Sequence, residues 1–334
     1  MQELNKLLRS SSSEVCMVGI LGIGGIGKTT IAKAIYNQLH SNFDGSCFLA
    51  NVGGDSKHPE GLIHLQEKIL SSIHASDNRK ITLVDRGTTV LKDRAWCKRV
   101  LLVLDNVDHQ DQLDKLAIRR SYFQPGSIII ITTRDESILK FAKVDESKIY
   151  KPPTLDYHES IELFSWHAFE KDHPIEDYAE LSQQVIGYAG GLPLVLTVLG
   201  SNLSYKSIDE WKGTLKTLKV IPDKEIQEKL MVSFNSLSDT QKDLFLDLAC
   251  FFVGREKKDA FKILQYSYSS LKSDLGVLVC QCLVAIDSLN RLTMHDMIRD
   301  MGKEVARRGC SRLWNLEDLL YVLEHDEVRF RCLC

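Results

Sequence analysis

The segment that decides the fold is Val15-Cys-Met-Val-Gly-Ile-Leu21, followed by Gly22-Ile-Gly-Gly-Ile-Gly27-Lys28-Thr29. The first seven residues are apolar at both alternating sets of positions, which predicts a strand that is buried on both faces. The next eight fit the pattern G-x-x-x-x-G-K-[ST] without a mismatch. Apolar residues then recur four apart, which predicts a helix over Thr29–His40. A strand, a glycine-rich turn and a helix in this order are typical of an α/β unit that binds phosphate.

The glycine-rich turn carries residue types that phosphate binding requires. Glycines let successive backbone N–H groups curl around an anion, and the following helix points its positive end at that anion. We expect Lys28 to reach the β- and γ-phosphates of a nucleotide, and the Thr29 hydroxyl to ligate Mg²⁺. A chance match in a flexible loop is the alternative, and the position between strand and helix argues against it. The predicted nucleotide-binding residues are Gly22, Gly24, Gly25, Ile26, Gly27, Lys28, Thr29 and Thr30.

Three further apolar runs predict strands of the same parallel sheet, at Cys47–Val52, Val100–Leu104 and Ser127–Ile131. Asp105 directly follows the second run, and we expect it to hold Mg²⁺ through water; the alternative is an aspartate that merely ends a strand. Arg134 follows the third run closely. An arginine at this edge of a sheet can sense a γ-phosphate, because open parallel sheets bind ligands there, and an ordinary surface arginine is its alternative.

Length and composition limit the classes of function that remain open. The chain has 334 residues, enough for two domains or three small ones, with 44% apolar and 26% charged residues. Its 42 basic and 45 acidic side chains leave a net charge of −3, which disfavours nucleic acid as a partner. No apolar run is long enough for a membrane span, and no secretory signal is visible. Nine cysteines without metal-ligand spacing predict reduced thiols in an intracellular protein.

Helical patterns replace strand patterns after Pro152-Pro153. Asp156 with Glu159 three residues on fits a capping box, and it predicts a helix start. Further helices are expected at about 176–188, 192–203 and 208–218.

Pro222 separates a third section, in which Ser238 and Gln241 fit a second capping box. Short strands are then expected at Cys282–Ile286 and Arg291–Met294, with a helix over about 295–309. Helices followed by a small hairpin and another helix are typical of a winged helix.

Six motifs occur in one order along the chain, and together they resemble a known family. They are Gly22-Ile-Gly-Gly-Ile-Gly-Lys-Thr-Thr30, Leu102-Val-Leu-Asp-Asn-Val-Asp108, Ile130-Ile-Thr-Thr-Arg-Asp135, Gly190-Gly-Leu-Pro-Leu194, Phe245-Leu-Asp-Leu-Ala-Cys-Phe-Phe252 and Met294-His-Asp296. This set resembles the NB-ARC nucleotide-binding module of plant NLR disease-resistance receptors, from about Leu4 to about Asp326. Asp108 and the fifth motif resemble the TIR-containing subclass.

The resemblance implies an α/β P-loop NTPase domain, followed by a small helical domain and a winged-helix domain. We therefore expect a linker at 1–14, the P-loop domain at 15–151, the helical domain with its GLPL motif at 152–221 and the winged helix with its MHD motif at 222–312. We expect residues 313–334 to be a tail without leucine-rich repeats. The sequence starts inside the linker and stops before any repeats, which leaves a fragment and a natural NB-only product as alternatives.

The resemblance also implies roles for individual residues. Pro193 would lie against the adenine base, His295 would contact the β-phosphate of ADP in the resting state, and Arg134 would respond to a γ-phosphate. A proline that only ends a loop and a histidine of the core are the alternatives. The implied protein is an ADP/ATP switch that uses Mg²⁺. On activation it would associate with itself or with other NLR proteins, in the cytoplasm and also in the nucleus.

Asn106 departs from the family pattern. The family commonly has a second aspartate at this position, often proposed as the catalytic base, and an amide cannot accept a proton as a carboxylate can. We therefore expect at most a slow ATPase. Three alternatives stay open: an ATPase whose main output is catalysis, an ATPase with a DNA-binding winged helix, and a decoy that binds nucleotide without signalling.

Overall fold

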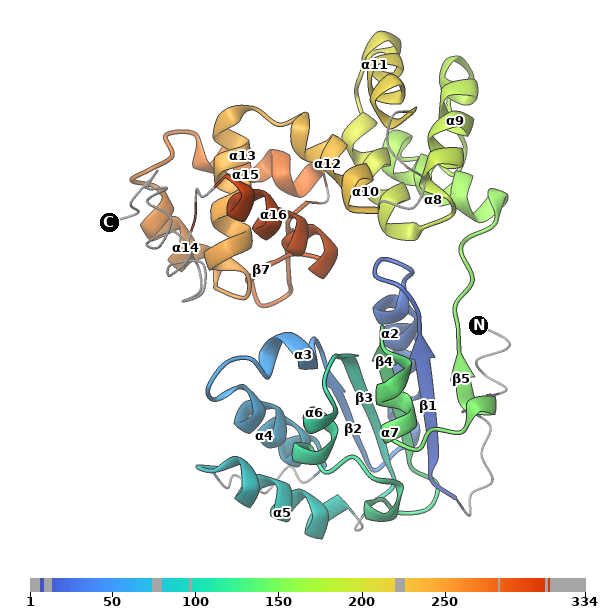
Figure 1. Ribbon diagram of the computed structural model, residues 1–334, viewed down its shortest axis with the longest axis vertical. Coiled ribbons are helices and arrows are strands. Elements are labelled where there is room, and N and C mark those ends of the chain that lie inside the picture. Colours follow the sequence, from blue (N-terminus) through green and yellow to red (C-terminus); the bar gives the residue numbers. More distant parts are fainter. Residues whose placement is uncertain are drawn as a thin grey trace. The chain divides into compact units, whose positions relative to one another are not determined.

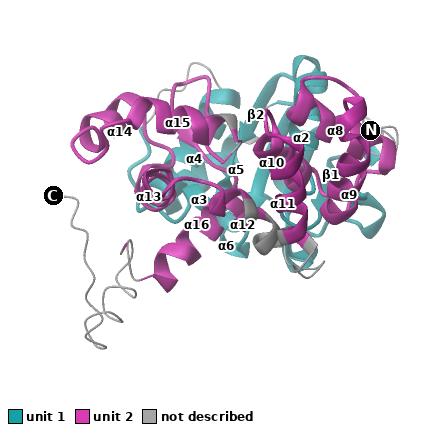
Figure 2. Ribbon diagram, turned by 90° about the horizontal axis from the view of Figure 1, so that it is seen from above, with its two compact units in different colours: residues 1–153 teal, residues 154–334 magenta. Residues whose placement is uncertain are grey.

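The computed structural model of the chain describes residues 7–8, 14–73, 80–95, 98–219, 226–281, 283–309 and 312. The chain forms two compact units, residues 1–153 and 154–334, which are teal and magenta in Figure 2. Most of the predicted linker 1–14, the predicted break at Pro222 and the whole predicted tail 313–334 lie outside the described residues.

The first unit is built on a parallel sheet with the strand order β2-β3-β4-β1-β5 (Figure 1). Its strands are β1 (Cys16–Leu21), β2 (Gly45–Leu49), β3 (Val100–Val107), β4 (Ile128–Thr133) and β5 (Ile149–Tyr150). The strand β4 lies between β1 and β3, so the end of β1 and the end of β3 are separated by one strand. The prediction of an α/β domain with a parallel sheet is confirmed.

Helices cover both faces of this sheet. They are α2 (Lys28–Leu39), α3 (Val52–Asp55), α4 (Gly61–Ile73), α5 (Val84–Ala95), α6 (Gln110–Lys115) and α7 (Glu136–Phe141), with 3₁₀ turns η1 (His40–Asn42), η2 (Arg120–Tyr122) and η3 (Glu146–Lys148). All six residues of β1 are buried. Val18 and Ile20 pack in one apolar cluster with Ile35 of α2, whereas Met17 and Leu21 belong to the cluster on the other face. Burial on both faces explains why the strand is continuously apolar.

Several predicted strand boundaries are wrong. The strand β2 starts at Gly45, before the predicted Cys47, and β4 runs from Ile128 to Thr133 instead of from Ser127 to Ile131. The strand β2 ends at Leu49, and Val52 starts α3 instead of ending the strand. The reason is Asn51, whose backbone is left-handed (φ 50°) and whose side chain accepts a hydrogen bond from the Gly54 N–H. The strand β3 continues past Leu104 to Val107, because Val107 pairs with β4 after a shift in register.

The described residues of the second unit form mainly helices, together with one antiparallel hairpin. Its elements are α8 (Tyr157–Phe169), η4 (Glu176–Tyr178), α9 (Ala179–Ala189), α10 (Pro193–Leu203), α11 (Ile208–Lys219), α12 (Ile226–Asn235), α13 (Asp239–Asp247), the π-helical segment η5 (Leu248–Phe252), α14 (Lys257–Leu264), α15 (Leu271–Cys280), β6 (Ala285–Ile286), β7 (Leu292–Thr293) and α16 (Asp296–Arg308). Both predicted capping boxes, at Asp156 and at Ser238, are confirmed.

The segment from α13 to α16 has the element order of a winged helix, as predicted. The antiparallel hairpin β6–β7 is shorter than expected, and Cys282 lies outside the described residues. An ion-pair network stabilises this segment: the buried Arg312 donates to Asp247 Oδ1 at 2.9 Å and to Asp243 Oδ1 at 2.9 Å. Tyr268 donates a hydrogen bond to the same Asp247 carboxylate. Among the described residues, every helix is too short or too polar to span a bilayer.

Candidate nucleotide-binding site

The glycine-rich loop joins β1 to α2 at the carboxyl end of the sheet. Gly25 and Gly27 have left-handed backbones (φ 79° and 94°), a conformation that residues with a Cβ rarely adopt. The helix α2 starts directly after Gly27. The side chain of Lys28 is buried, and its Nζ donates to the carbonyl oxygens of Gly22 at 2.7 Å and Ile23 at 2.8 Å. The lysine therefore lies along the inside of the loop, where the backbone N–H groups can surround an anion.

The two predicted metal ligands lie next to each other. Thr29 Oγ1 donates to Asp105, at 2.9 Å from Oδ1 and 3.0 Å from Oδ2. The sequence predicts that Asp105 follows the strand, but Asp105 lies within β3, and its side chain is buried. A hydroxyl and a single carboxylate fit Mg²⁺, which prefers oxygen ligands and keeps several waters. No group of three or more His, Cys, Asp or Glu side chains within the described part of the chain could form an all-protein metal cage.

Thr132 is a residue of this site that the sequence did not single out. Its Oγ1 donates to Asp105 Oδ1 at 2.7 Å and accepts from the Asn106 N–H at 2.8 Å. The hydroxyl is buried on β4, which lies beside β3. A threonine at the carboxyl end of a strand next to the predicted metal ligand is the signal that could have identified it.

Asn106, the residue that departs from the family pattern, has a left-handed backbone with φ 58°. Its side-chain Nδ2 donates to Asn51 Oδ1 at 2.9 Å. The position thus places an amide beside the metal ligand Asp105. Arg134 follows β4 directly, as predicted, and its side chain is exposed at the same sheet edge. The first unit therefore brings together the loop, Thr29, Asp105 and Asn106.

Pro193 and His295 belong to the second unit. Pro193 is the first residue of α10, after Gly190 and Gly191, which both have left-handed backbones. The Gly191 carbonyl accepts from the Leu155 N–H at 2.8 Å, and a Cβ on Gly191 would lie 2.4 Å from the Leu155 oxygen. Only glycine therefore fits at the second position of this motif.

His295 is the N-cap of α16. Its Nδ1 accepts a hydrogen bond from the Met297 N–H at 3.1 Å, and its side chain is exposed. The structure thus gives the imidazole a local role in starting a helix. The contacts of Pro193 and His295 with nucleotide stay predictions.

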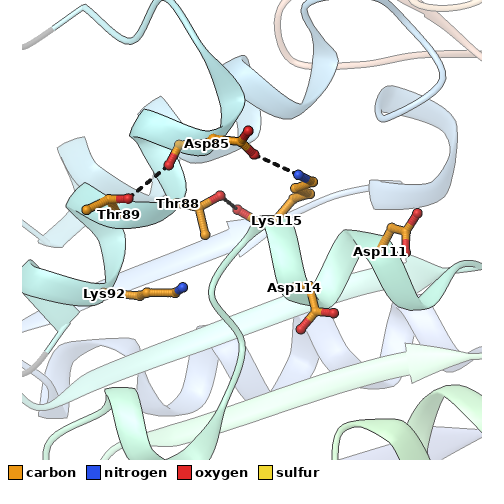
Figure 3. Close-up of a pocket in the computed structure, with 7 residues that line it drawn as sticks. All are labelled: Asp85, Thr88, Thr89, Lys92, Asp111, Asp114 and Lys115. Carbon is orange, nitrogen blue, oxygen red and sulfur yellow. Dashed lines mark hydrogen bonds and ion pairs between the residues drawn. The ribbon is translucent and has the colours of Figure 1, made fainter.

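A polar hollow of about 470 Å³ lies between α5 and α6 (Figure 3). Its lining residues are Asp85, Thr88, Thr89, Lys92, Asp111, Asp114 and Lys115. Lys115 Nζ lies 2.7 Å from Asp85 Oδ1, and this ion pair raises the pKa of Lys115 and lowers that of Asp85. None of the predicted nucleotide-binding residues lines this hollow, so it is distinct from the site at the glycine-rich loop.

Comparison with known families agrees with the fold. The profile described as "NB-ARC domain" matches residues 1–174, and the profile described as "Disease resistance protein Roq1-like, winged-helix domain" matches residues 238–310. The chain belongs to the NB-ARC family. Membership of this family and the geometry of the glycine-rich loop imply nucleotide binding.

The relatives of the chain are plant disease-resistance proteins. "Disease resistance protein RPV1" of Vitis rotundifolia is 39% identical over 98% of this chain, and "TMV resistance protein N" of Nicotiana glutinosa is 36% identical over 98% of it. The chain spans 24% and 29% of the lengths of these two relatives. A solved STAND-class signal transduction ATPase with a tetratricopeptide repeat sensor, from Pyrococcus horikoshii, matches 98% of this chain and 45% of its own chain. Its TM-score of 0.51 at 16% identity indicates a shared fold.

Proposed function

We propose that the chain is the ADP/ATP-binding switch of a plant intracellular immune receptor of the TIR-containing subclass. Membership of the NB-ARC family and the names of its relatives support this proposal. The observation that carries it is the constellation of Lys28, Thr29 and Asp105, because a lysine inside the glycine-rich loop and a hydroxyl–carboxylate pair are what Mg²⁺–nucleotide binding requires. Bound Mg²⁺ would neutralise phosphate charge, and Thr29 and Asp105 would hold it.

A switch requires that ADP and ATP differ in their affinity for the resting and the active state. We expect His295 to favour the ADP-bound resting state by contacting the β-phosphate. Arg134 would favour the ATP-bound active state by contacting the γ-phosphate. The active state would then associate with itself or with other NLR proteins, in the cytoplasm and also in the nucleus.

Hydrolysis in this proposal is slow or absent, and it serves only to reset the switch. Asn106 offers an amide where the family commonly has a carboxylate base. The Asn106→Asp variant is therefore expected to hydrolyse ATP faster in single-turnover assays, since general-base assistance contributes about 10²–10⁴-fold. A rate within about twofold of wild type, with unchanged ATP affinity, would show that this position orients groups and supplies no base.

The alternative of a DNA-binding winged helix receives no support from α15, the helix that precedes the hairpin. In helix-turn-helix proteins the second helix of the motif enters the major groove. The sequence of α15, LKSDLGVLVC, contains one basic residue, Lys272, and a buried aspartate, Asp274, that accepts hydrogen bonds from Ser270 and Gln241. Such a helix has few side chains that could contact DNA phosphates or donate hydrogen bonds to base edges.

The experiment that tests the switch is mass spectrometry of the nucleotide that co-purifies with the native protein. We expect tightly held ADP, and protein that carries no nucleotide would overturn the proposal. Rapid multiple-turnover hydrolysis would instead favour the purely catalytic alternative. Tight ADP binding without any effect of the bound nucleotide on self-association would favour the decoy.

Two variants of His295 separate a nucleotide contact from helix capping. His295→Ala removes both the imidazole and the cap, whereas His295→Asn keeps a good N-cap residue without the imidazole. If the imidazole holds ADP, both variants release ADP faster, by about 5- to 150-fold for a coupling of 1–3 kcal/mol. If Asn restores the wild-type rate of ADP release, the role of His295 is capping alone.

A further inference from the structure

A chain of hydrogen bonds leads from the predicted metal ligands to the start of α3. Thr29 and Thr132 both donate to the Asp105 carboxylate. The Thr132 hydroxyl accepts from the backbone N–H of Asn106, and Asn106 Nδ2 donates to Asn51 Oδ1 at 2.9 Å. The last step joins two asparagines, Asn51 and Asn106, from separate strand ends, and we refer to them as the asparagine pair.

The asparagine pair is under unusual backbone constraint. Both residues have left-handed backbones, with φ of 50° at Asn51 and 58° at Asn106. Asparagine is among the few residues besides glycine that visit this region, and such residues concentrate at functional sites when their surroundings hold them there. Asn51 Oδ1 accepts a second hydrogen bond, from the Gly54 N–H at 3.3 Å, and so caps α3. One oxygen therefore joins α3 to the residue after Asp105.

Gly53 and Gly54, the second and third residues of α3, are packed closely against neighbouring side chains. A Cβ on Gly54 would lie 2.2 Å from Asn51 Nδ2, and a Cβ on Gly53 would lie 2.6 Å from the Asp108 carboxyl carbon. The backbone of α3 thus lies directly against the asparagine pair and against the residues that follow β3. The Asn51 side-chain oxygen is therefore the contact through which a change in the position of Asn106 would reach the backbone of α3.

We propose that Asn51 is a positioning residue that holds α3 against the metal-binding end of β3, and that the asparagine pair couples occupancy of the nucleotide site to α3. The coupling rests on the proposed function, in which Thr29 and Asp105 hold Mg²⁺. Thr29 and Asp105 would hold the metal ion, and its charge would compete with Thr29 and Thr132 for the carboxylate oxygens of Asp105. A change in the bond from Thr132 to Asp105 would in turn alter the bond that the Thr132 hydroxyl accepts from the backbone N–H of Asn106.

Variants at Asn51 test the proposal without changing a residue beside the metal ligand. Asn51→Gly removes the amide but suits the left-handed backbone. Asn51→Asp keeps an oxygen that accepts from both Asn106 Nδ2 and the Gly54 N–H, and aspartate also tolerates this backbone. Asn290→Gly is the matched control, because Asn290 is an exposed asparagine with φ 57° in the turn between β6 and β7.

The measurement is hydrogen exchange of peptides covering residues 50–58, without ligand and with Mg²⁺–ADP, together with the rate of ADP release. In the ligand-free protein we expect Asn51→Gly to exchange about five- to tenfold faster, because it loses the side-chain hydrogen bonds from Asn106 Nδ2 and from the Gly54 N–H, while Asn51→Asp and Asn290→Gly match wild type. Mg²⁺–ADP should alter exchange in wild type and Asn51→Asp. It should leave Asn51→Gly unaffected, and that variant should release ADP about tenfold faster.

Wild-type protection in Asn51→Gly would overturn the positioning role, and so would an Asn51→Asp variant as unprotected as Asn51→Gly. An Asn51→Gly variant that still responds to Mg²⁺–ADP as wild type does would overturn the coupling. If calorimetry detects no binding of Mg²⁺–ADP to wild type, the proposed function fails and the coupling fails with it. The ligand-free comparison of the same variants decides the positioning role in that case as well.

Discussion

The change of Lys28 to alanine is the most direct test of the nucleotide site. The lysine lies inside the loop, and its ammonium group donates to the carbonyl oxygens of Gly22 and Ile23 at 2.7 and 2.8 Å. Gly22 is half-buried and Ile23 is exposed, so water can replace the ammonium group in the variant. The fold should therefore survive the change, and the effect should fall on nucleotide affinity.

The size of this effect follows from an exchange of hydrogen bonds. Two bonds from the ammonium group to phosphate oxygens contribute about 3–6 kcal/mol, at about 1.5–3 kcal/mol for each bond to a charged group. To form them, Lys28 gives up its two carbonyl bonds, which we take as about half as strong because they lack the Coulomb attraction between two opposite charges. The net loss is about 1.5–3 kcal/mol, and it corresponds to about 10- to 150-fold weaker binding.

The assay is calorimetric titration of Mg²⁺–ADP, with the amount of nucleotide retained after purification as a second readout. Lys33→Ala is the matched control, because Lys33 is an exposed lysine on the same helix. Circular dichroism of both variants checks that the fold is intact. If Lys28→Ala binds within about threefold of Lys33→Ala and retains as much ADP, Lys28 is not the phosphate-binding lysine and the site assignment fails.

Three further outcomes are expected. Arg312→Met should destabilise the second unit by about 3–5 kcal/mol in urea unfolding, because it leaves the buried Asp247 carboxylate without its ion pair; the exposed Arg307→Met should not. Gly191→Ala should lower the melting temperature, because its Cβ would collide with the Leu155 carbonyl; unchanged melting would contradict this. Burial raises the pKa of three thiols, that of Cys250 to about 11, so peptide mapping should find them unalkylated by iodoacetamide at pH 8 in the native protein; labelling as fast as in urea would refute this. These thiols are Cys16, Cys47 and Cys250.

Local patterns predicted the elements whose causes are themselves local. The capping boxes at Asp156 and Ser238 depend on residues three apart, and both form as the sequence indicates. The burial of β1 on both faces was visible as a continuous apolar run. The glycine-rich loop was equally clear, because its left-handed positions and its lysine are encoded within eight residues.

Local patterns failed where a contact between distant segments sets the boundary. The strand β2 stops at Leu49, just before the left-handed Asn51, and the Asn51 side chain is also held by a hydrogen bond from Asn106, which lies 55 residues further along. The short strand β5 forms because β1 offers it a partner, and two residues carry too little pattern to be noticed.

The sequence by itself therefore determined the class of chemistry: a phosphate-binding loop, a carboxylate on another strand of the same sheet, and the order of the motifs that define the family. Only the tertiary structure decided which side chains share Asp105, because β4 brings the Thr132 hydroxyl to a carboxylate 27 residues away. It also decided that Asn106 faces Asn51. The physical reason is that a parallel sheet places the carboxyl ends of its strands at one edge, so residues far apart in the chain become neighbours there.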